Sequence, residues 1–171
     1  MREIKMDVAY EEFMEKYPRV YAYFRFWQNL FEGIEEDVAD TIIVEEPSTV
    51  FISAPLWVET TTDKAIIRIK ENIAKELEHK GYFLSEDEPP RKRPIDEAMF
   101  HEFLHVLCFY RPEMFQPGCL IIDFVPVWLT HADPPRTVEG LTERVKIINR
   151  WWKNYAKGAI HRYEWLKEKY K

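Results

Sequence analysis

The apolar residues of this chain recur at two spacings, and this pattern limits the fold more than any other feature. Some segments repeat them every three to four residues, as amphipathic helices do, and shorter runs are rich in Val, Ile and Thr. We expect helices over 8–17, 19–33, 60–80, 94–110 and 137–171, and strands over 41–45, 49–54, 56–59 and 118–129. These elements predict an α+β fold with a small, mostly antiparallel sheet and a long C-terminal helix.

The length of the chain predicts one domain. A chain of 171 residues can bury about two thirds of its unfolded surface around one core, so we expect residues 1–171 to form a single domain. The 46% of hydrophobic residues supply that core. Charge and proline gather over 85–93 and 131–136, and we expect both segments to be exposed loops.

The sequence also bears on the compartment. The longest stretch without a charged residue, 47–58, is shorter than the roughly 20 apolar residues of a membrane-spanning helix. The N-terminal residues lack the apolar region of a secretory signal, so we expect a cytoplasmic protein without a membrane span. Cys108 and Cys119 form no CxxC pair, and we expect both to be free, buried thiols.

Charge is distributed unevenly along the chain. Residues 144–171 contain nine Lys or Arg against two Glu, a net charge of +7. Because the whole chain carries a formal charge of -6, the remainder carries -13. Tryptophan and tyrosine alternate with the basic residues over 150–171, which suits nucleic acid, an anionic membrane surface or a partner helix. The alternative is an amphipathic helix that packs on the acidic body of its own chain.

One motif in the predicted helix 94–110 carries the chemistry of a metal site. His101 and His105 are four residues apart, so their imidazoles lie on one face of the helix, one turn apart. Between them, Glu102 completes the pattern HExxH and is placed to take a proton from water on the metal. The remaining residues from Ala98 to Tyr110 are almost wholly apolar, which is unusual for a solvated helix face.

With this triplet and its apolar surroundings, the chain resembles the zincin type of zinc metallopeptidase. The resemblance covers about ten residues. It implies a zinc cofactor, His101 and His105 as ligands, Glu102 as general base, and a peptide as substrate. The pattern departs from the metzincin subgroup, because Cys108 and Arg111 stand where that subgroup has glycine and histidine.

The third ligand is open at this stage. His131 follows the predicted strand 118–129 and would complete a three-histidine site, so we rank it first. Glu139 and then Glu143 are the alternatives that a gluzincin arrangement would use. Asp123, alone in an apolar segment, is a candidate outer-shell acceptor that would fix a histidine tautomer.

Other interpretations of the sequence compete with a metal site. Polar side chains on an amphipathic helix explain the motif without metal, and the basic aromatic C-terminal helix indicates a non-enzymatic interaction protein as the alternative function. A di-iron site would pair the motif with Glu76 and His79, but it needs a four-helix bundle. No serine lies in GxSxG and the five glycines are dispersed, so these sequence patterns indicate neither a serine hydrolase nor a phosphate-binding loop. A thiol nucleophile at Cys108 is less favoured than core packing.

Overall fold

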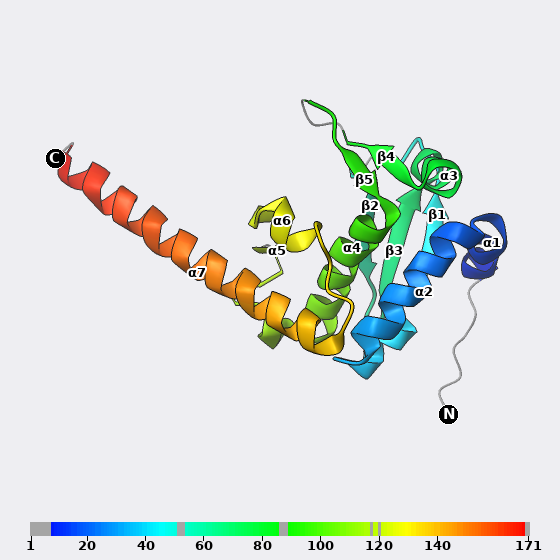
Figure 1. Ribbon diagram of the computed structural model, residues 1–171, viewed down its shortest axis with the longest axis horizontal. Coiled ribbons are helices and arrows are strands. Elements are labelled where there is room, and N and C mark those ends of the chain that lie inside the picture. Colours follow the sequence, from blue (N-terminus) through cyan, green and yellow to red (C-terminus); the bar gives the residue numbers. More distant parts are fainter. Residues whose placement is uncertain (1–7, 51–53, 86–88, 117, 120, 170–171) are drawn as a thin grey trace.

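The computed structural model describes residues 8–50, 54–85, 89–116, 118–119 and 121–169 (Figure 1). Helices and strands are grouped along the chain: two helices precede three strands, a third helix precedes a two-stranded hairpin, and the remaining described elements are helical. The α+β class expected from the sequence is confirmed. The helices are α1 (Val8–Lys16), α2 (Pro18–Glu32), α3 (Glu71–Lys80), α4 (Ile95–Tyr110), α5 (Ile121–Phe124), α6 (Val127–Thr130) and α7 (Val138–Lys169), with 3-10 turns η1 (Glu36–Asp40) and η2 (Pro112–Met114). The strands are β1 (Ile42–Glu46), β2 (Leu56–Thr60), β3 (Ala65–Lys70), β4 (Tyr82–Leu84) and β5 (Lys92–Pro94).

The main sheet has three strands in the order β1-β3-β2. Strand β3 is central, parallel to β1 and antiparallel to β2, while β4 and β5 form a separate antiparallel hairpin. Arg68 on the central strand forms ion pairs with Glu46 of β1 and Glu59 of β2, so one side chain links all three strands. The main sheet is small, as expected, and mixed; together with the hairpin, two of the three described strand pairs are antiparallel, in line with the expected antiparallel majority.

Helix α4 forms the centre of the core. It packs against α2 on one side and against β2 and β3 on another (Figure 1). The contact with α2 is aromatic: Trp27 lies 5.3 Å from Phe100, and Phe31 lies 5.7 Å from Phe103, between ring centroids. All four side chains are fully buried, each contributing about 1.5–3 kcal/mol of burial free energy.

The helix predicted over 60–80 is wrong in its first half. Residues 56–70 form the β2–β3 hairpin, and helix α3 begins only at Glu71. The isoleucines of β3 satisfy helical spacing, but β-branched residues pack well on a pleated sheet, and both neighbouring strands pair with this segment. Gly81 ends α3 as expected, with a φ of 86° in the left-handed region.

Two strand predictions also need correction. The apolar run 118–129 is not a strand; its described residues form the short helices α5 and α6, separated by Pro126, which cannot donate to a strand ladder. Strand β1 pairs in parallel with β3 and not in a hairpin with 49–54, a segment of which 51–53 lie outside the described residues.

The cysteines are bonded to each other. Cys108 at the end of α4 forms a disulfide with Cys119, with 5.7 Å between their Cα atoms, so the expectation of free thiols is wrong. The residues are 11 apart in sequence, and no spacing rule predicts that the chain returns to α4 at this point. The bridge attaches the segment before α5 to the central helix.

Helix α7 is as long as expected and leaves the body of the molecule. Its first half packs on the domain through Leu141, Val145 and Ile148, while the remainder projects away from it (Figure 1). The segment 131–136 is irregular, with Asp133 and Arg136 exposed; residues 86–88 of the loop expected over 85–93 lie outside the described residues. Within the described chain, no helix has the length and apolar character that crossing a membrane requires.

A distant carboxylate caps the start of α2. Tyr17, the N-cap residue, makes no side-chain capping bond. Instead the backbone N–H groups of Arg19 and Val20 each donate to a carboxylate oxygen of Glu78 on α3, both at 2.9 Å. These N–H groups would otherwise lack an intrahelical partner, and the negative charge favours the helix N-terminus.

The variant Glu78→Ala tests this cap. We expect the free energy of unfolding to fall by about 1–2 kcal/mol, because two N–H groups lose their acceptor. The measurement is urea denaturation beside Glu76→Ala, which removes only an exposed pair with Lys80 and is expected to cost less than about 0.5 kcal/mol. Equal losses in the two variants would contradict the capping role.

Candidate metal site

The two histidines of the HExxH motif lie on the one side of α4 that is not packed in the core. His101 and His105 are half-buried, and their ring centroids are 5.0 Å apart. Neighbouring residues on the other sides of the helix, including Phe100, Phe103 and Leu104, are fully buried. The core therefore fixes the helix, and the helix fixes the spacing of the two imidazoles, as the sequence predicts.

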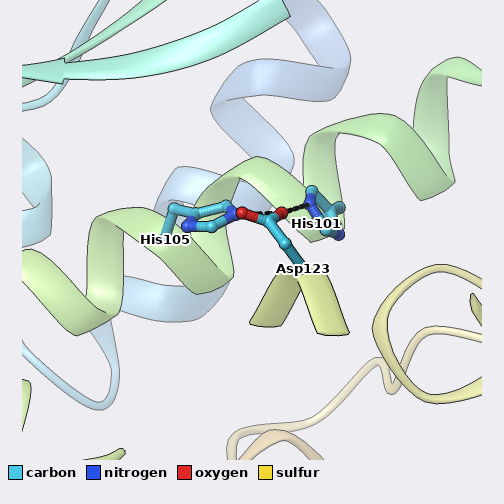
Figure 2. A group of neighbouring side chains, drawn as sticks. All are labelled: His101, His105 and Asp123. Atoms are coloured by element: carbon cyan, nitrogen blue, oxygen red, sulfur yellow. Dashed lines mark hydrogen bonds and ion pairs between the residues drawn. The ribbon is translucent and has the colours of Figure 1, made fainter. Parts of the chain in front are cut away.

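The third member of the group comes from α5. Asp123 places its Oδ1 atom 3.3 Å from Nε2 of His101 and 3.1 Å from Nε2 of His105 (Figure 2). Ligand atoms about 2.05 Å from a tetrahedral zinc ion lie roughly 3.3 Å from each other, so these distances fit a metal site as well as hydrogen bonds. Among the described residues, these three side chains form a group whose donor atoms all lie within 4.8 Å of one another.

The donor set fits a divalent metal ion. Two imidazole nitrogens and one carboxylate oxygen are ligands that zinc takes, and three protein ligands leave a position for water or substrate. The Asp123 side chain is 58% exposed, so the group is open on that side. The sequence assigned Asp123 only an outer-shell role, and its one visible signal was a lone acid in an apolar segment.

Charge in the group is concentrated on Asp123. The hydrogen bonds donated by His101 and His105 hold the pKa of this carboxyl well below its usual range. Burial lowers the pKa of His101. Burial also works against charge on His105, but the hydrogen bond to Asp123 and the charge of Glu102 outweigh it and raise the pKa of His105. The group thus combines a negatively charged carboxylate with two imidazole nitrogens, and this combination favours the binding of a cation.

Glu102 lies next to this group and is buried, with 7% of the residue exposed. Burial raises the pKa of its carboxyl to about 8. It borders the same cavity as the three candidate ligands, so its place is compatible with the role of general base expected for it. A buried carboxyl group with a raised pKa, next to other titratable side chains, is typical of active sites.

His131 lies beside the group without joining it. Its ring stacks on that of His101, with 4.2 Å between centroids, and its Nδ1 lies 3.2 Å from the hydroxyl of Thr130. Burial and the neighbouring His101 lower the pKa of His131 to about 3, so the ring is neutral. Glu139 and Glu143 lie exposed on α7, and neither belongs to the donor group. The ligand role of His131 therefore stays a prediction.

A cavity of about 710 Å³ opens in front of the group. Its walls come from β2, the β4–β5 hairpin, α3 and α4, and include Trp57, Glu76, Phe83 and Arg93. Sequence reasoning gave Trp57, Phe83 and Arg93 no place at the site, because they come from separate elements, and it connected Glu76 with the motif only in the less favoured di-iron interpretation. The cavity is large enough for a small molecule or a few peptide side chains.

Comparisons with protein-family models, with curated proteins and with solved structures found no match for this chain. The inference about function therefore depends on the site itself.

Arg144 on α7 holds the segment that carries His131. Its guanidinium donates to the backbone carbonyl oxygens of Leu129 at 2.9 Å, Ala132 at 3.2 Å and Asp133 at 2.9 Å. Leu129 lies in the last turn of α6, where carbonyl groups have no intrahelical partner, and Ala132 and Asp133 follow the helix. One side chain thus ties the irregular segment to α7.

Replacing Arg144 with alanine should loosen residues 129–133. We expect the free energy of unfolding to fall by about 2–3 kcal/mol, because three carbonyl groups lose a charged donor. Hydrogen exchange of amides in 129–133 should speed up. The control is Arg150→Ala on the same helix, which removes an exposed pair with Glu143 and should leave both readouts nearly unchanged. Unaltered exchange in the Arg144 variant would refute the role.

Proposed function

We propose that this protein is a zinc-dependent hydrolase that acts on peptide bonds. In this proposal His101, His105 and Asp123 hold the metal, and Glu102 is the general base. The observation that carries it is the convergence of two Nε2 atoms on one carboxylate oxygen, at 3.3 and 3.1 Å, beside the buried glutamate of an HExxH motif. His131 is the alternative third ligand.

The reaction would follow from the placement of these groups. Bound zinc lowers the pKa of a water to about 7 and polarises a carbonyl group. Glu102 would take one proton of a water molecule in the cavity while the oxygen of that water bonds to the carbonyl carbon of the substrate and the C=O π electrons move onto the carbonyl oxygen. Glu102 then gives its proton to the leaving amine nitrogen as the C–N bond breaks. The cavity in front of the group supports this proposal by providing room for substrate.

Metal content tests the ligands directly. We expect protein purified without a histidine tag to hold about one zinc per chain by elemental mass spectrometry, and His105→Ala to hold almost none. Asp123→Ala should lower zinc affinity at least 100-fold and His131→Ala much less. His79→Ala is the matched control, because His79 lies exposed at the end of α3. A wild-type protein that cannot retain zinc would refute the metal site.

The role of Glu102 separates binding from catalysis. Glu102→Gln keeps the shape of the side chain and removes the base, so we expect zinc content to persist while peptide hydrolysis falls roughly 10²–10⁴-fold. The measurement is cleavage of a mixed peptide library by the zinc-loaded protein. If cleavage continues undiminished in Glu102→Gln, a different residue is the base.

A second candidate function is association through α7. Tyr155 is 50% exposed and Trp165 is 58% exposed on the part of the helix that projects from the body (Figure 1). Trp151 and Tyr155 stack at 5.3 Å, and Trp152 contacts Phe124 of α5 at 6.2 Å, so an aromatic surface continues from the buried half of α7. Exposed aromatic surface of this kind is typical of protein interfaces.

We propose a second copy of this chain as the partner. The segment 144–171 carries +7 and the remainder -13, so the basic helix of one copy is complementary to the acidic body of another. The same acidic body would repel nucleic acid. Continuity with the buried Leu141–Ile148 face supports a helix that extends its contacts onto a neighbour.

The double variant Tyr155→Glu, Trp165→Glu tests this partner. We expect light scattering coupled to size exclusion to show a concentration-dependent dimer for the wild type and an at least tenfold weaker one for the variant. Asn154→Glu, exposed on the same helix, is the control for added charge. A monomer at all concentrations would contradict the proposal, and binding of single-stranded RNA at low salt would favour the nucleic-acid alternative instead.

A further inference from the structure

The disulfide joins the two elements that carry the candidate ligands. Cys108 lies on α4 three residues after His105, and Cys119 lies four residues before Asp123. Along the main chain His105 and Asp123 are 18 residues apart. The covalent path through the disulfide is much shorter, so the bridge restricts how far the carboxylate can move from the imidazoles.

The other restraints that hold Asp123 in place are non-covalent. Helix α5 has four residues, which is too short to be stable by itself. The hydrogen bonds of the Asp123 side chain are those that it accepts from His101 and His105. Ile121 and Ile122 are buried in the core and anchor α5 without covalent bonds. The carboxylate is therefore placed by one covalent restraint, the disulfide, and by the packing around α5, where Ile121, Ile122 and Val125 are buried and Phe124 contacts Trp152 of α7.

We propose that the Cys108–Cys119 disulfide positions Asp123 for metal binding, so that the affinity of the site for zinc depends on the redox state of this pair. The inference rests on the proposed function, because it takes Asp123 as a ligand. The cysteines are positioning residues: neither is proposed to touch the metal.

The switch is a thiol–disulfide exchange with a dithiol reductant. A thiolate of the reductant attacks the sulfur of Cys119, which is partly exposed, and the S–S bond breaks. The second thiol of the reductant then displaces Cys119, leaving two protein thiols and an oxidised, cyclic reductant. Reducing compartments keep such pairs reduced, so the predicted cytoplasmic location would make this exchange relevant in the cell.

Reduction should weaken the site without abolishing it. The segment between α4 and α5 gains conformations when the bridge opens, and ordering it again opposes metal binding. The buried Ile121 and Ile122 still hold α5 near α4. We therefore expect the zinc dissociation constant to rise about tenfold, comparable to the loss of a residue that orients a ligand.

The experiment compares zinc affinity in the oxidised and reduced full-length protein. A chromophoric chelator competes for zinc, and a phosphine reductant opens the bridge, taking up oxygen from water as the two thiols form. The variant Cys108→Ala, Cys119→Ala should bind zinc like the reduced wild type in both conditions. Circular dichroism checks that each sample is folded. If the double variant does not fold, the chemically reduced wild type provides the protein without the disulfide.

A cycle with Asp123→Ala distinguishes positioning from general destabilisation. If the bridge acts through the carboxylate, reduction should leave the weak zinc affinity of Asp123→Ala unchanged. An equal tenfold loss on reduction in the wild type and in Asp123→Ala would overturn the inference, because the bridge would then act on the fold as a whole.

The two proposals fail in different ways. If oxidised wild-type protein binds no zinc, the metal site is refuted, and the positioning role of the disulfide is refuted as well. If oxidised protein binds zinc, His105→Ala abolishes binding and reduction changes nothing, the metal site stands and the positioning role of the disulfide is refuted. Tighter zinc binding after reduction would also refute it, because the released thiols would then be acting as ligands.

Discussion

The burial of α4 is the constraint on which the rest of the structure depends. The helix meets α2 through aromatic rings and the sheet through β2 and β3, so most of its surface is removed from water. Such a helix can carry polar side chains only on a side that faces solvent or a cavity. His101 and His105 occupy that side, and the cavity lies in front of them. The same helix thus forms the centre of the core and fixes the positions of the two histidines.

The sequence predicted the helices better than the strands because helical periodicity is a local property. Helices α2, α4 and α7 follow the expected ranges closely. The apolar residues of α2 and α7 recur on one face, and α4 is apolar on nearly every side except that of its histidines. The segment 65–70 fits helical spacing as well as strand pairing, and its two neighbours in the sheet decide the outcome. The strand predicted over 118–129 is wrong for a related reason, because a continuous apolar sequence does not distinguish a strand from short buried helices.

The candidate site was predictable to the extent that it lies on one helix. His101, Glu102 and His105 are related by helical geometry, so their spacing alone brings them together. Asp123 comes from another element. The path of the chain between α4 and α5, with the disulfide that joins its two ends, follows from no spacing rule. His131 ranks first from its place in the sequence after the apolar run 118–129. In the structure its ring stacks on that of His101, and it does not belong to the donor group of His101, His105 and Asp123.

Acidic side chains lie on both outer strands of the three-stranded sheet. Both outer strands carry glutamates, Glu45 and Glu46 on β1 and Glu59 on β2, while Arg68 of the central strand pairs with two of them. An outer strand normally offers unpaired backbone groups on which another sheet can grow, and charged side chains discourage that growth. The carboxylates of β1 and β2 should therefore protect this small sheet from aggregation, while the edge of β2 beside the cavity stays accessible to smaller molecules.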